Sequence, residues 1–234
     1  MLSVLLLVAM VACAAAMVAE QVRQHRRRSR ERAALLDPAT AVLDDADRQV
    51  DATHLPSLSG RYRGWEARLD LLVDTLMLRR LPRLWLRAEV RRSLPVGGPL
   101  YVVRQACTAQ ALEAGGRLTR ELVAPADWPE GLVVRTDPER PFHLPGALAP
   151  VGRLFDAEEI VSVLVSPRGV RVAAEAARGE AAAFRVSRDA RFQAPVAPEL
   201  AARLLGVTAD LAEALHRAPS GDSAGPARAA DPPA

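Results

Sequence analysis

Residues 160–176 read IVSVLVSPRGVRVAAEA, and they give the clearest structural signal in the chain. The first six are rich in β-branched residues, which favour β-strands. The tetrapeptide Ser166-Pro167-Arg168-Gly169 has the residues of a tight turn, and a second apolar run begins at Val170. The pattern therefore predicts a β-hairpin. A return strand is expected after it at residues 183–187, beyond a second turn.

A second strand region is predicted between Gly60 and Gln105. Apolar residues alternate with polar ones in residues 65–73 and again in residues 84–90, which is typical of half-buried strands. Residues 100–105 supply a third β-rich run, so the region favours an antiparallel meander with one solvated face. The first segment also allows a helix, because apolar residues there follow helical spacing at Trp65, Leu69, Leu72, Val73 and Leu76.

The remaining elements complete an α+β plan. A short helix is predicted at residues 108–113 and a short strand at residues 132–135, with proline-rich irregular chain around them. Near the C-terminus a helix is expected to cover one face of the sheet with the apolar residues Leu200, Leu204, Val207, Leu211 and Leu215. The fold class is α+β, with a mainly antiparallel sheet made of two meander-like strand groups. The domain is assigned to residues 58–217, and residues 218–234 are too poor in large apolar residues to pack.

Residues 1–19 carry no charge, and an arginine-rich run follows them at once. As a helix they would reach about 28 Å, close to the ~30 Å hydrocarbon core of a bilayer. We therefore expect a single transmembrane anchor. A cleaved signal peptide is the alternative, since residues 14–16 are small, but no Lys or Arg precedes the apolar run and many arginines follow it.

The arginines predict an orientation. Positive charge beside a span stays on the cytoplasmic side, so we expect the N-terminus outside the cell, the domain in the cytoplasm and the lipid bilayer as a partner. A reporter fused after Arg217 should then behave as cytoplasmic. We interpret the run as a topology signal rather than a specific lipid site. Its membrane-proximal members are Arg23, Arg26, Arg27, Arg28, Arg30 and Arg32.

Residues 20–57 resemble a connector, with a basic half followed by an acidic half. Pro38 separates the two halves, and helix is plausible on either side of it. A solvated helix or a loose linker is the expected structure. Residues from Leu58 onward should then fold by themselves, with a cooperative thermal transition.

Composition and motifs exclude several chemistries. The net charge of +3 is modest, so a nucleic-acid partner is poorly supported. The only two cysteines are Cys13 and Cys107, which rules out a disulfide within the domain. The common phosphate-loop, dinucleotide and zinc motifs are missing. We expect no metal or cofactor, because the four histidines are scattered, at His25, His54, His143 and His216.

Three sets of residues are candidates for a site. Cys107 could be a nucleophile, although a buried structural thiol is the commoner role. The acidic cluster of Asp156, Glu158 and Glu159 could hold a cation or do acid-base work, although such clusters are commonly helix starts or solvated turns. A basic, aromatic-bearing surface could bind phosphate-rich or acidic partners by charge and stacking; it comprises Arg79, Arg80, Arg83, Trp85, Arg87, Arg91 and Arg92.

These features leave three classes of function. The first is a membrane-anchored interaction or scaffold module with a protein partner, favoured by the predicted anchor and the missing motifs. The second is an enzyme whose site is assembled from scattered carboxylates and arginines. A polar pocket that joins the acidic cluster to an arginine would favour it. The third is a binder of anionic lipid headgroups or nucleic acid through the Arg/Trp surface, for which a contiguous positive face is required.

Overall fold

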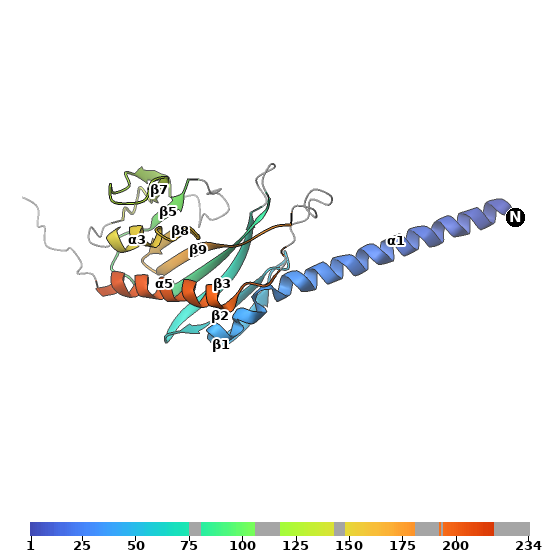
Figure 1. Cartoon of the computed structure of the whole chain (residues 1–234), viewed down its shortest axis with the longest axis horizontal. Helices are drawn as coiled ribbons and strands as arrows, with labels where there is room; N and C mark the ends of the chain where they lie inside the picture. The colour runs from blue at the N-terminus through green and yellow to red at the C-terminus, as the bar shows by residue number, and fades with distance from the viewer. Residues whose placement is uncertain (75–80, 106–117, 143–147, 181–191, 193, 218–234) are drawn as a thin grey trace, which may run out of the picture.

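The computed structural model describes residues 1–74, 81–105, 118–142, 148–180, 192 and 194–217. Within them the strands form one antiparallel sheet in the order β1-β2-β3-β4-β9-β8-β5-β7-β6, and Figure 1 shows α5 lying across it. The helical elements are α1 (Leu2–Ala33), the 3₁₀ helix η1 (Ala34–Val42), α3 (Leu148–Leu154) and α5 (Pro198–Arg217). The strands are β1 (Asp44–Val50), β2 (Pro56–Tyr62), β3 (Trp65–Asp74), β4 (Arg83–Arg91), β5 (Leu100–Arg104), β6 (Arg120–Leu122), β7 (Leu132–Thr136), β8 (Ile160–Ser166) and β9 (Gly169–Arg178). The chain is thus α+β with a large antiparallel sheet and a C-terminal helix, as predicted.

The hairpin predicted from residues 160–176 is confirmed. Strands β8 and β9 pair antiparallel, and the pairing begins at the turn with Ser166 opposite Gly169. The Ser166 hydroxyl donates to the Gly169 carbonyl oxygen (3.2 Å) and accepts from the Arg168 amide (3.3 Å). A serine that bonds both arms of the turn in this way stabilises it. The other edge of β9 pairs with β4, so the hairpin forms the centre of the sheet.

The upstream meander is confirmed for β3 and β4, which are joined by the unpredicted strand β2 on the other edge of β3, but it does not extend to β5. The alternating apolar side chains of β3 join the main core on one face, as predicted for a strand, and the alternative helix does not form. Strand β5 does not continue the meander, because β9 occupies the free edge of β4. It pairs instead with β8 and β7. The two strand groups are therefore parts of one continuous sheet, joined along β4 and β9.

Apolar side chains on the two faces of the sheet form two cores. The main core lies between the sheet and α5, whose buried residues include Leu204, Leu211 and Leu215 from the predicted apolar stripe. The opposite face carries a smaller apolar cluster of Trp85, Tyr101, Val103, Leu118, Val161 and Ala173, which we call the second cluster. Strand β4 contributes to both cores, because its successive side chains alternate between the faces.

The stretch expected to be a connector takes part in this fold. Residues 34–42 form η1, and Leu35, Leu36 and Leu43 in and after it are buried in the main core. The Val196 amide donates to the Leu35 carbonyl oxygen (2.8 Å), which ties η1 to the start of α5. The acidic residues 44–50 form β1, an edge strand paired with β2. The charged side chains of β1 suit an edge, because they discourage pairing with another chain.

The prediction of a transmembrane anchor at residues 1–19 has to be corrected. Helix α1 runs without a break from Leu2 to Ala33 and projects from the domain (Figure 1). No helix within the described part of the chain is both long enough and apolar enough to cross a membrane. Glu20 begins the charged part of the same helix, which continues to Arg32. The assignment of residues 1–19 as a membrane span is therefore not supported.

Several predicted elements lie outside the described residues. They are the short helix at residues 108–113, the return strand at residues 183–187 and the C-terminal tail at residues 218–234. The predicted short strand at residues 132–135 is confirmed as β7.

Candidate functional site

The Arg/Trp surface lies on the predicted face of β4, but its tryptophan is buried. Trp85 is only 1% exposed and packs in the second cluster. The Arg83 guanidinium carbon lies 5.8 Å from the centre of the Trp85 ring. A covered ring cannot stack on a base or a headgroup, so this part of the predicted binding mode is not available. Arg79 and Arg80, from the same prediction, lie outside the described residues.

The described arginines of this surface are paired. Arg87 bonds Asp70 of the neighbouring strand β3, and Glu89 accepts from Arg171 at 2.6 Å and from Arg91 at 3.2 Å. Arg92 instead stacks on Trp65, with its guanidinium carbon 3.9 Å from the ring centre. Together the paired residues form an arginine–carboxylate ladder across β3, β4 and β9, which comprises Asp70, Arg83, Arg87, Glu89, Arg91, Arg171, Glu175 and Arg178.

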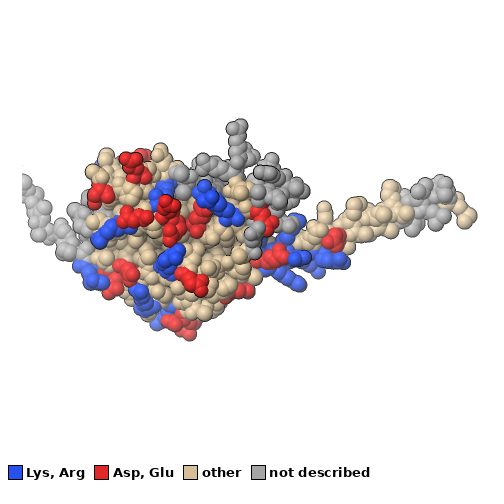
Figure 2. All heavy atoms as spheres, viewed as in Figure 1, with Lys and Arg blue, Asp and Glu red and all other residues tan. Residues whose placement is uncertain are grey.

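The carboxylates of the ladder offset part of the positive charge that the sequence places on β4. Each described arginine of this surface has a carboxylate partner or an aromatic ring, so a new anion would have to displace an existing contact. Elsewhere the charges are also mixed. Figure 2 shows blue and red side chains interspersed over the visible face of the domain, while blue gathers on the domain-proximal half of α1. A contiguous positive face of the kind needed to bind nucleic acid is not seen in that view.

Glu89 makes the ladder sensitive to pH. Burial by itself would raise the pKa of Glu89, but the hydrogen bond and attraction of Arg171, followed by those of Arg91, lower it below its usual 4.5. A carboxylate with a depressed folded pKa stabilises the fold above its unfolded pKa, and this stability is lost as the pH falls through the folded value.

We therefore expect Glu89→Gln to lower stability by about 1 to 3 kcal/mol at pH 7. The difference from the native chain should shrink as the pH falls below 4.5, because Glu89 of the unfolded chain then takes up a proton while the folded carboxylate, with its lowered pKa, still resists it. Urea unfolding at pH 7 and pH 3.5 measures both effects. Glu66→Gln is the matched control, since Glu66 is exposed and lies 4.0 Å from Arg91. Equal and pH-independent losses in the two variants would contradict the prediction.

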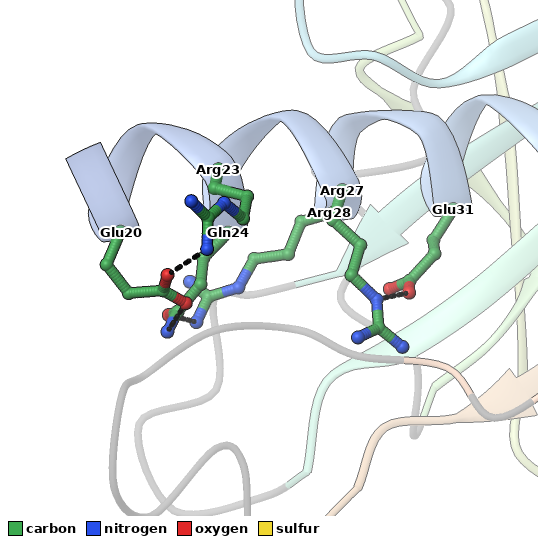
Figure 3. A pocket seen from close by; sticks show the side chains of 6 residues that line it. All are labelled: Glu20, Arg23, Gln24, Arg27, Arg28 and Glu31. Carbon is green, nitrogen blue, oxygen red and sulfur yellow. Dashed lines mark hydrogen bonds and ion pairs between the residues drawn. The ribbon is translucent and has the colours of Figure 1, made fainter.

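The basic run on α1 is held largely by contacts within the helix. Figure 3 shows these side chains around a hollow of about 390 Å³ on one face of α1. Arg23 pairs with Glu20 at 3.0 Å, and Arg27 pairs with Glu31 at 2.8 Å. Such pairs, three or four residues apart, stabilise a helix by a few tenths of a kcal/mol each. They fit a solvated helix face better than an anion site, because both glutamates lie in the same hollow.

The predictions on histidine and cysteine are only partly tested. Cys107 and His143 lie outside the described residues. Among the described ones, no group of three metal-ligating side chains forms. His25 of α1 contacts His54 edge to face, with ring centres 5.9 Å apart, and His216 Nδ1 lies 3.3 Å from the Ser93 carbonyl oxygen. The three described histidines therefore lie in two separate local contacts.

A small apolar pocket lies where α3 and α5 meet the ends of β8 and β9. Its volume is about 190 Å³, and we call it the α3–α5 pocket. The apolar walls come from α3, from the turn before β8, from both strands and from α5. The charged residues are Arg153, Glu159 and Arg203. The apolar lining comprises Leu154, Ala157, Ile160, Ala174, Leu200, Leu204 and Val207.

Part of the predicted acidic cluster reaches this pocket. Glu159 lines it and pairs with Arg203 of α5 at 3.1 Å, whereas Asp156 and Glu158 are exposed and do not line it. The structure thus brings one predicted carboxylate to an arginine that the sequence did not single out. Arg203 does not belong to the predicted apolar stripe of its helix, and no local pattern in the sequence links it to a carboxylate 44 positions earlier.

Arg104 holds the turn that forms one wall of the pocket. Its guanidinium donates to the carbonyl oxygens of Ile160 (2.8 Å), Ala157 (3.0 Å) and Phe155. It also lies over the Phe155 ring, 5.6 Å from its centre. One charged donor with three carbonyl acceptors fixes backbone that has no strand or helix of its own. The wall between α3 and β8 is therefore preformed.

The chain was also compared with known proteins. No protein-family model, curated protein or solved structure matches it. The argument for function therefore rests on the geometry of this chain.

Proposed function

We propose that the chain is an interaction module that binds a protein partner through the α3–α5 pocket. The observation that carries the proposal is a preformed apolar hollow with three charged residues among its lining. Its volume is close to that of cavities that hold one benzene-sized group. An apolar anchor side chain in such a pocket, surrounded by polar contacts, is the usual centre of a protein interface.

The chemistry of the lining favours binding over catalysis. Among the residues that the structure describes, no histidine, cysteine, serine or threonine lines the pocket. The one carboxylate, Glu159, is already paired with Arg203. An enzyme built from carboxylates and arginines is the second candidate, and this pair is the observation that favours it. Its reaction would need Glu159 itself, whereas an anchor pocket needs only the apolar walls.

A pocket-filling substitution tests the proposal. Val207→Trp places a large side chain in the pocket from the α5 wall, and we expect it to reduce recovery of a specific partner at least tenfold in pull-downs from a cell extract. Ala214→Trp is the matched control, because residue 214 lies two turns along the same helix and does not line the pocket. Thermal melting confirms that both variants are folded.

The outcomes separate the candidates. Loss of the same partner in Val207→Trp but not in Ala214→Trp supports the interaction site. Equal recovery with both variants contradicts it. Two results together would favour the enzyme. Glu159→Gln and Val207→Trp would reduce recovery of the partner equally, and a small molecule would be turned over only by chains that keep Glu159.

A further inference from the structure

Helix α1 exposes apolar side chains where it projects beyond the domain. From Ala9 to Arg27 its described side chains are exposed, and Val11, Val18 and Val22 are 61%, 60% and 45% exposed. Exposed apolar surface that is gathered along one element marks an interaction surface. The spacing and charge of α1 indicate which partner would fit.

Four of the exposed apolar positions of α1 form a seam with the spacing of a two-helix pair, and Met10 and Met17, each 65% exposed, lie to one side of it. Val11, Ala15, Val18 and Val22 are separated by four, three and four residues, which keeps them on one side of α1 as in a coiled coil. The seam is also symmetric about a point between residues 16 and 17. In an antiparallel pair Val11 therefore lies opposite Val22 of a second copy, and Ala15 lies opposite Val18. This reciprocity is what a two-fold interface between identical chains requires.

Small side chains beside the seam allow close contact. Ala12, Ala14 and Ala19 flank the seam, and Gln21 is the other flanking residue before the arginines. Helices with such flanks can approach to about 8 to 10 Å, the usual distance between packed helices. Charged flanks would set the helices apart or select another partner, and none lies between Val11 and Ala19.

The charge of α1 selects the antiparallel arrangement. Residues 20–33 hold six arginines against two glutamates. In a parallel pair these basic halves would lie side by side, within the ~8 Å Debye length of physiological salt. In the antiparallel pair their centres lie about 33 Å apart along the axis, so their repulsion is screened.

We propose that α1 is a self-association helix, which pairs antiparallel with α1 of a second copy through Val11, Ala15, Val18 and Val22. The pairing places the two domains at opposite ends of the helix pair. It is independent of the α3–α5 pocket, which lies on the domain.

Sedimentation velocity of the full chain tests the pairing. We expect a concentration-dependent dimer, and we expect Val18→Glu to raise its dissociation constant at least tenfold, because two buried carboxylates would enter the seam. Ala16→Glu is the matched control, since residue 16 lies on the other side of the same turns and should leave the dimer intact. Both positions are exposed in a single chain, so neither variant should change its thermal melting.

Cysteine cross-linking tests the direction. In a chain with Cys13→Ala and Cys107→Ser, a Val11→Cys variant mixed with a Val22→Cys variant should form a disulfide between the two chains. Each variant alone should not. Cross-linking of each variant with itself would indicate a parallel pair and overturn the proposed arrangement.

Two further results would overturn the proposal. One is a chain that stays monomeric at all concentrations. The other is a chain whose seam binds lipid instead of a second copy. Such a chain would be a monomer that floats with phosphatidylcholine vesicles, and Val18→Glu would abolish the flotation.

Discussion

Deletion of residues 1–57 is expected to abolish cooperative unfolding, because it removes part of the core. Leu35, Leu36 and Leu43 are buried against the sheet and α5, and β1 covers the edge of β2. Loss of one buried leucine side chain costs roughly 2 to 5 kcal/mol. Three such losses approach the whole stability of an ordinary domain, about 5 to 15 kcal/mol. Thermal melting followed by circular dichroism should show no sigmoidal transition.

Deletion of residues 2–24 is the control for this experiment. It removes most of α1 but keeps η1, β1 and the contact of His25 with His54. Because the described side chains lost are exposed, we expect the midpoint of thermal unfolding to change by no more than a few degrees. A chain that begins at Leu58 and still melts cooperatively would show that η1 is dispensable. That result would support the sequence-based domain boundary.

The parts of the fold that the sequence predicted are those set by local patterns. The hairpin of β8 and β9 follows from two β-rich runs around Ser166-Pro167-Arg168-Gly169, all within 20 residues. The alternation in β3 and the apolar stripe of α5 each reflect one element facing one core. Such patterns depend on which side of an element is buried. They do not depend on what buries it.

The parts of the fold that could not be predicted depend on pairing between strands that are far apart in the sequence. β9 rather than β5 occupies the edge of β4, a choice between strands about 70 residues apart. Residues 44–50 have the composition of a linker, and only their bonding to β2 makes them a strand. Leu35 and Leu36 in η1, and Leu43 after it, show no regular spacing by which they could be recognised as core residues.

The predictions of site residues were right about single elements and wrong about contacts between elements. Alternation placed Trp85 on the correct face of β4, but the residues that cover it, such as Tyr101 and Val161, come from β5 and β8. The partners of the β4 arginines likewise come from β3 and β9. Glu159 was identified as part of an acidic cluster, yet its partner Arg203 lies on another element. The sequence shows where the charged residues are along the chain, but whether they form ion pairs depends on the tertiary structure.

Gly169 shows how a local turn signal and a tertiary constraint meet in one residue. Its φ of +146° is a backbone conformation that residues with a side chain rarely adopt. It also faces β4, where a Cβ atom would lie 2.2 Å from the Val90 carbonyl oxygen and 3.0 Å from the Arg91 Cα atom. The turn alone would favour glycine here. The close approach of β4 makes glycine necessary, since both neighbouring atoms belong to backbone in the centre of the sheet.

We expect Gly169→Ala to destabilise the fold by about 3 kcal/mol or more, as strained backbone and overpacking each cost about 1 to 3 kcal/mol. Gly64→Ala is the matched control, because Gly64 also has a positive φ, +81°, but a Cβ atom there would meet nothing within 4 Å. It should cost only about 1 kcal/mol, from the backbone conformation alone. Urea unfolding of the two variants measures the difference. Equal losses would mean that β4 and β9 can separate at Gly169 without cost, and that the hairpin is less tightly joined to the meander than the pairing of Arg91 with Gly169 indicates.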